Sequence, residues 1–123
     1  MKTIIYLGGI YNLLFAIFHM GFWKMFNWGE ELKKIDVVNS AVMQVMNVHL
    51  IYYFLFTAVI CFAFPTELKT SKLGKAFLLS CAGFWLLRTV QQFIFFEINI
   101  GTYVLTAILL IGVVLFALPV FKK

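Results

Sequence analysis

The chain has 123 residues, of which 63% are hydrophobic and 12% are charged, and its mean hydropathy is +0.99. A soluble domain has about 45–50% apolar and about 25% charged residues, and a chain this short cannot bury such an excess in one small core. These values exclude a soluble globular domain, a disordered chain and a fibrous repeat, and they argue against nucleic-acid binding although the net charge is +5.

Four apolar stretches are each long enough for a membrane-spanning helix, which needs about 20 residues. We expect the spans at residues 3–26, 41–64, 75–96 and 100–121 of a single domain, with Glu97, Asn99 and Gly101 forming a tight turn between the last two. The first stretch lacks an Ala-x-Ala cleavage site, so we interpret it as an uncleaved span and not as a signal peptide. No stretch alternates polar and apolar residues as a membrane β-strand does. The sequence therefore predicts an all-α integral membrane protein, an antiparallel four-helix transmembrane bundle.

The lysines distinguish the two sides of this predicted bundle. Six lysines and one acid belong to the two termini and the loop at 65–75, whereas three lysines and four acids belong to the opposite side. Because short cytoplasmic loops carry the excess of positive charge, we expect both termini in the cytoplasm, with the basic side against anionic headgroups. The compact form of the chain suggests a prokaryotic inner membrane.

The loop between the first two spans is expected to form a short helix that lies in the outer membrane interface. Asn27 and Glu30 have the spacing of a capping box, and Glu30 and Lys34 the spacing of a favourable helical ion pair. Four apolar side chains of this segment are expected to face the bilayer: Trp23, Trp28, Leu32 and Ile35. An aromatic belt that anchors the end of the first span would explain the tryptophans equally well.

The loop at 65–75 is interpreted as a plain connector on the inner side. Pro65 cannot continue the second helix, and Ser71 is a candidate cap for the third. Cys61 and Cys81 lie at similar depth near this loop. In the absence of a CxxC motif, we interpret them as small buried side chains, with a disulfide or redox pair as the alternative.

The polar residues of each span fall on one stripe, because a helix turns about 100° per residue. The stripes are Asn12, His19 and Trp23; Ser40, Gln44 and Asn47; Arg88, Gln91 and Gln92; and Asn99, Thr102, Tyr103 and Thr106. Polar groups within a bilayer usually face the bundle interior, and all of these except Asn12 fall in the outer half. We therefore predict a polar pocket that opens to the extracytoplasmic side and is lined by His19, Gln44, Asn47, Arg88, Gln91, Gln92, Thr102 and Thr106.

Arg88 carries a permanent charge, and no acidic residue occurs within the four predicted spans. One interpretation is that Arg88 binds the anionic end of a ligand, such as a carboxylate, a phosphate or a heme propionate. The other is that it extends to the outer interface and hydrogen-bonds Gln91, Gln92 and backbone carbonyls.

His19 and His49 are the candidate heme or metal ligands. No HxxxH, HxxE or CxxC spacing is present, and zinc normally takes three or four ligands. His49 also lies about 180° from the Gln44 and Asn47 stripe, which argues against a shared site with His19 and favours contact with a neighbouring helix, a lipid or another subunit.

Three functions remain open from the sequence. The first is a membrane module that binds an amphipathic anionic molecule or lipid, with Arg88 as the anion clamp. The second is a heme- or metal-binding enzyme or electron carrier that uses His19. The third is an accessory or transport subunit of a membrane oligomer, formed with copies of itself or with a partner subunit.

Overall fold

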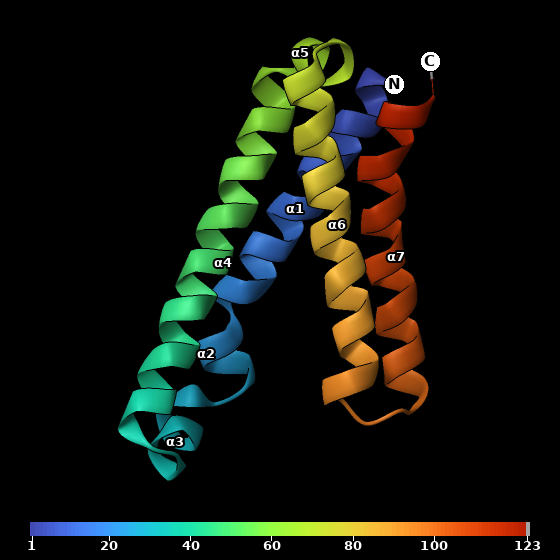
Figure 1. Ribbon diagram of the computed structural model, residues 1–123. Helices are drawn as coiled ribbons and strands as arrows, with labels where there is room; N and C mark the ends of the chain where they lie inside the picture. The colour runs from blue at the N-terminus through green and yellow to red at the C-terminus, as the bar shows by residue number, and fades with distance from the viewer. Residues whose placement is uncertain (123) are drawn as a thin grey trace. The chain divides into compact units, whose positions relative to one another are not determined.

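The computed structural model describes residues 1–122, and helices make up 89% of the chain with no strand in the described part. Four helices are long and apolar enough to cross a membrane: α1 (Lys2–Met20), α4 (Val37–Ala63), α6 (Lys72–Phe95) and α7 (Ile100–Phe121) (Figure 1). Shorter helices connect them: α2 (Phe22–Met25), α3 (Trp28–Glu31), the 3-10 helix η1 (Leu32–Lys34) and α5 (Pro65–Thr70). The prediction of an all-helical chain with four candidate spans is confirmed.

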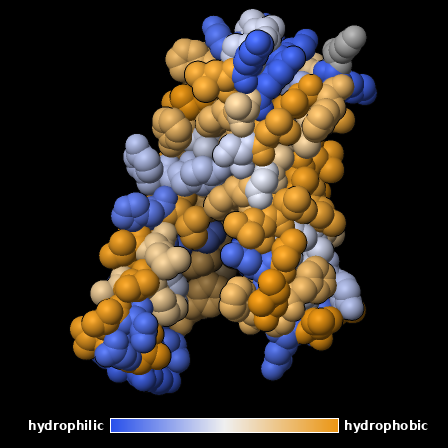
Figure 2. All heavy atoms as spheres, in the orientation of Figure 1, coloured by the Kyte–Doolittle hydropathy of each residue, from blue (hydrophilic) through white to orange (hydrophobic). Residues whose placement is uncertain are grey.

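The chain divides into two compact units, each described by itself below. The terminal unit contains Met1–Gly8 and the chain from Cys61 onward, and the central unit contains Gly9–Ile60. Figure 2 shows hydrophobic side chains over most of the helix surfaces in view. Hydrophilic side chains gather at the α5 end of the terminal unit and, separately, around α3 in the central unit.

In the terminal unit, α6 and α7 pack side by side (Figure 1). Leu78 and Trp85 of α6 and Leu109 and Phe116 of α7 are almost fully buried. The first turns of α1 also belong to this unit, and Gly8 lies against the ring of Phe116. The core of the unit is therefore apolar and contributed mainly by these two long helices.

The turn at residues 96–99 is closed by a capping box at the start of α7. The Asn99 side chain accepts from the backbone N–H of Thr102 at 3.1 Å, and the Thr102 hydroxyl accepts from the backbone N–H of Asn99 at 3.2 Å. Thr102 also donates to the backbone carbonyl of Glu97. These bonds satisfy amide groups that a helix start otherwise leaves unpaired, so the interruption expected at Glu97 and Asn99 is confirmed as a tight turn.

The connection from α4 to α6 is not a plain connector, because Pro65–Thr70 form helix α5, although Pro65 and Ser71 act as expected. Helix α4 ends at Ala63, and Pro65 is the first residue of α5. Ser71 caps α6, because its hydroxyl accepts from the backbone N–H of Gly74 at 2.8 Å. Cys61 and Cys81 are both buried, and neither forms a disulfide.

The loop at residues 21–36 of the central unit differs from the sequence prediction in two places. Asn27 precedes α3 with a left-handed backbone, φ 51°, and its side chain makes no capping bond. A capping residue normally has an extended backbone that turns its side chain toward the helix amides. The predicted capping box of Asn27 and Glu30 is therefore wrong.

The predicted ion pair of Glu30 with Lys34 is also wrong. Glu30 pairs with Lys33 at 3.2 Å, and Glu31 pairs with Lys34 at 2.9 Å. The reason is that the α-helical turn passes into the 3-10 helix η1 at residue 32, and three residues per turn aligns side chains three positions apart.

Helix α4 begins earlier than its predicted span. The Asp36 carboxylate accepts from the backbone N–H groups of Val38 at 3.1 Å and Asn39 at 3.2 Å. A carboxylate at this position satisfies the first amides of the helix and also favours its dipole. Asp36 therefore sets the start of α4 at Val37.

We predict opposite effects of alanine at two glycines of α6. A Cβ at Gly74 would lie 2.3 Å from the Glu67 carbonyl oxygen and 2.4 Å from Leu68 Cα, whereas a Cβ at Gly83 would meet nothing within 4 Å. Gly74→Ala should therefore lower the free energy of unfolding by about 1–3 kcal/mol. Gly83→Ala should raise it by about 0.5–1 kcal/mol, because glycine is unfavourable within a helix. Equal stability of the two variants in a detergent unfolding titration would contradict the close approach of α5 to α6.

Candidate functional site

Two polar side chains of the predicted pocket form a reciprocal pair between α1 and α4 in the central unit. His19 Nδ1 lies 2.8 Å from Asn47 Oδ1, and Asn47 Nδ2 donates to the backbone carbonyl of His19 at 3.0 Å. Because the amide oxygen only accepts, Nδ1 carries the proton in this arrangement. Asn47 is buried and His19 is half-buried, so the pair ties the two helices together.

A second contact joins the same helices through Gln44. Trp23 Nε1 donates to Gln44 Oε1 at 3.1 Å. Gln44 Nε2 then donates to the backbone carbonyl and the hydroxyl of Ser40, at 3.3 and 3.4 Å. The polar stripes expected on these two spans therefore meet in the central unit.

A third contact lies nearer the start of α1. Asn12 Nδ2 donates to the hydroxyl of Thr57 at 2.7 Å, and both residues are buried. The Thr57 hydroxyl also contacts the backbone carbonyls of Tyr53 at 2.9 Å and Phe54 at 3.1 Å. Asn12 belongs to the polar stripe predicted for the first span. Thr57 was not predicted, because a single threonine in an apolar helix does not indicate a hydrogen-bond partner on another helix.

His49 lies apart from His19. It is exposed, and its Nδ1 bonds the Val45 carbonyl of its own helix at 2.9 Å. This position agrees with the calculated separation of about 180° between His49 and the Gln44 and Asn47 stripe. The hydrogen bonds of His19 and His49 have no partner in common. No group of three or more His, Cys, Asp and Glu side chains that could hold a metal occurs within residues 1–122.

In the terminal unit, Arg88 is held by uncharged groups. The half-buried guanidinium donates from Nη1 to Gln92 Oε1 at 2.9 Å, and its Cζ lies 5.3 Å from the centre of the Phe96 ring. The ion pairs formed within residues 1–122 are those of Lys33 and Lys34, so Arg88 takes part in none of them. The amide oxygen and the ring face are attractive to a cation but carry no net negative charge.

The other candidates of this unit are placed less favourably for a ligand. Thr102 is buried and donates to a backbone carbonyl of the turn, and the Thr106 hydroxyl donates to the Thr102 carbonyl at 2.7 Å. Gln91 is half-buried on α6. The structure therefore brings Arg88 and Gln92 together in one unit, and His19, Gln44 and Asn47 together in the other. That both groups line one pocket stays a prediction.

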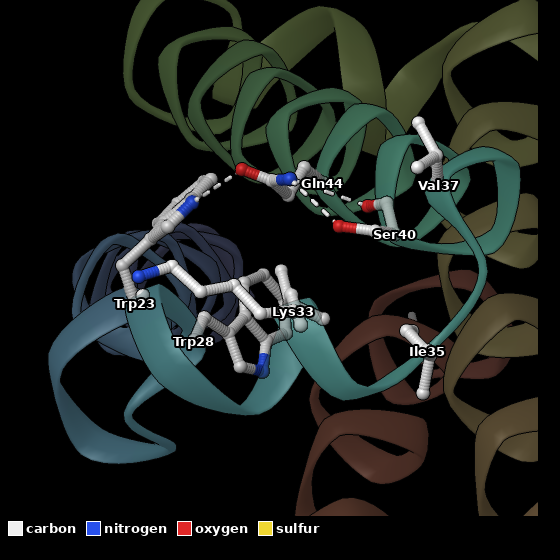
Figure 3. Close-up of a pocket in the computed structure, with 9 residues that line it drawn as sticks. Trp23, Trp28, Lys33, Ile35, Val37, Ser40 and Gln44 are labelled. Atoms are coloured by element: carbon white, nitrogen blue, oxygen red, sulfur yellow. Dashed lines mark hydrogen bonds between the residues drawn. The ribbon is translucent and has the colours of Figure 1, made fainter.

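The central unit contains a cleft that sequence reasoning did not find. It has a volume of about 490 Å³ and lies between the loop at residues 21–36 and the start of α4 (Figure 3). Its lining residues are Trp23, Trp28, Gly29, Leu32, Lys33, Ile35, Val37, Ser40 and Gln44. Leu32 was expected to face the bilayer but is only 8% exposed, because the 3-10 turn places it in this wall.

Comparison of the chain with models of known protein families, with curated proteins and with solved structures finds no match.

We predict that His19 and Asn47 are energetically coupled. In a double-mutant cycle of His19→Leu and Asn47→Leu, the coupling should be about 0.6 kcal/mol and at most about 1.7 kcal/mol, the range of interhelical hydrogen bonds in membrane proteins. The measurement is the free energy of unfolding in bilayers. As the matched control, His49→Leu with Asn47→Leu should give a coupling near zero, since these side chains make no shared contact. Equal coupling in both cycles would argue against the pair.

Proposed function

We propose that this protein is a four-span membrane protein that binds an amphipathic anionic molecule or lipid, with Arg88 as the clamp for its anionic group. The observation that carries this proposal is a guanidinium within a candidate span that bonds an amide oxygen, lies against an aromatic ring and forms no ion pair within residues 1–122. A charge at that depth is costly unless a partner compensates it. An anionic ligand group would supply the missing charge.

The proposed topology is an antiparallel bundle with both termini in the cytoplasm and α3 in the outer interface. It is supported by the lysines that gather near the termini and the α5 loop, as cytoplasmic segments require. In the terminal unit, both chain ends and α5 lie at the same end (Figure 1). The membrane would be a prokaryotic inner membrane.

The direction of the Arg88 side chain supports an outward-facing anion site. Helical side chains normally lean toward the N-terminus, but Arg88 contacts Gln92 and Phe96, which follow it. Arg88 precedes the end of α6 at Phe95 by about 10 Å of helix, so the guanidinium extends toward the outer headgroups. At this level a phosphate or carboxylate of an amphipathic molecule can reach it.

The polar residues nearest to the guanidinium define the core of the site. A guanidinium has five N–H donors in a planar fork that suits carboxylate and phosphate oxygens. Gln92 accepts from one of its nitrogens, and Gln91 lies on the same helix with a side chain of intermediate exposure. We assign ligand contact mainly to Arg88, Gln91 and Gln92, because the Thr102 and Thr106 hydroxyls donate to backbone carbonyls.

Replacement of Arg88 tests this function directly. In native mass spectrometry from nanodiscs that contain phosphatidylglycerol, Arg88→Gln should weaken retention of the anionic lipid at least about tenfold, the loss expected for a charge-assisted hydrogen bond. Arg88→Lys should keep part of it, because lysine retains the charge but not the fork. Lys69→Gln, which removes the same charge from α5, is the control. Equal retention by Arg88→Gln and Lys69→Gln would refute the clamp.

The proposed topology has its own test. An alkaline phosphatase, which folds only outside the cytoplasm, should be inactive when fused to the C-terminus and active when inserted after Glu31. A green fluorescent protein at the C-terminus should be bright. The reverse pattern would place the termini outside and would also remove the outer position assigned to Arg88.

A further inference from the structure

We propose that the cleft between the loop at residues 21–36 and α4 is a second binding site, which takes the headgroup of a phospholipid with net negative charge. All of its lining residues belong to the central unit, and Arg88, Gln91 and Gln92 are not among them. Its volume of about 490 Å³ is within the range of about 300–1,000 Å³ that ligand pockets have.

The walls of the cleft are aromatic and aliphatic. The rings of Trp23 and Trp28 lie 5.3 Å apart at an angle of 74°, so they form a corner. Leu32, Ile35 and Val37 continue the apolar surface. Tryptophan is enriched where membrane and water meet, because its ring is amphipathic. These walls suit the glycerol backbone and the first acyl carbons of a lipid.

Among the polar groups of the cleft, the amide nitrogen of Gln44 is a donor with weak partners. Trp23 holds the carbonyl oxygen of Gln44, which turns the Gln44 amide nitrogen toward Ser40 (Figure 3). That nitrogen makes only the long bonds of 3.3 and 3.4 Å to Ser40, which are weaker than ordinary hydrogen bonds. A phosphate oxygen would therefore improve on the present partners of Gln44.

Lys33 supplies the positive charge of the cleft. Its ammonium pairs with Glu30 at 3.2 Å, but the two side chains are 71% and 66% exposed, and such pairs contribute little. The lysine can therefore turn to a phosphate at small cost. None of the nine residues that line the cleft is acidic, and the carboxylate that pairs with one of them is Glu30, the partner of Lys33. The preference for a headgroup with net negative charge therefore rests on the ammonium of Lys33.

The chain contains an optical probe of this site. Two of its three tryptophans line the cleft, and the third, Trp85, is buried in α6. In a Trp85→Phe background, tryptophan fluorescence reports on the cleft alone. Dibrominated phosphatidylglycerol, mixed into phosphatidylcholine nanodiscs, quenches a tryptophan that it contacts, and the dependence on composition gives a relative binding constant.

We expect a saturable preference for brominated phosphatidylglycerol over brominated phosphatidylcholine, which Lys33→Gln lowers about fivefold, the effect of one lysine near anionic lipid. The matched control is Lys34→Gln, which removes an equal charge and breaks the neighbouring ion pair with Glu31 but does not alter a cleft residue. It should stay within about twofold of the parent.

Three outcomes would overturn the proposal. Equal losses in Lys33→Gln and Lys34→Gln would mean that only the general charge of the loop matters. Equal quenching by brominated phosphatidylglycerol and brominated phosphatidylcholine would mean that the tryptophans only anchor the protein at the interface. Competition by millimolar inorganic phosphate would assign the cleft to a free anion.

The two proposals can fail separately. If Arg88→Gln does not affect lipid retention while Lys33→Gln lowers the quenching preference, the Arg88 clamp is refuted and the cleft site is retained. The same measurements in the chain that retains Trp85 show whether the Trp85→Phe substitution itself alters the quenching.

Discussion

The cost of an unsatisfied polar group in hydrocarbon is the constraint on which this structure depends. Each unpaired N–H or C=O group in a bilayer costs several kcal/mol, so polar side chains on apolar helices must find partners within the protein. Among residues 1–122, no buried side-chain nitrogen or oxygen lacks a hydrogen-bond partner. In the central unit this requirement is met by bonds between α1 and α4, from Asn12 to Thr57, from His19 to Asn47 and from Trp23 to Gln44. In the terminal unit, Arg88 donates from one nitrogen to Gln92, and neither of the ion pairs formed within residues 1–122 compensates its charge.

The sequence predicted those features that depend on hydropathy and on the helical repeat. The four long helices follow from composition. Spacing predicted one polar stripe on α1 and one on α4, and in the structure His19 bonds Asn47 and Trp23 bonds Gln44. These pairings themselves were not predicted. The end of α4 before Pro65 and the cap of α6 at Ser71 were also predicted correctly. Both effects depend only on residues close in the sequence.

The remainder depends on backbone geometry that residue identity does not specify. The ion pairs of Glu30 and Glu31 shifted by one residue because the helix tightens to a 3-10 turn, and Asn27 adopts a left-handed backbone that disables its cap. The same 3-10 turn directs the Leu32 side chain to the wall of the cleft, where it is buried. Spacing within one helix could not reveal this cleft, because its lining comes from a loop and from the helix that follows it.

The turn between α6 and α7 has a consequence for how the protein reaches the membrane. Residues 96–99 are too few to let one helix cross while the other waits, and the capping box already satisfies the amides at the tip. The hairpin carries one acid, Glu97, and the guanidinium of Arg88, so these two side chains set most of the desolvation cost of its passage. Because the connection is so short, α6 and α7 would enter a membrane together as one hairpin.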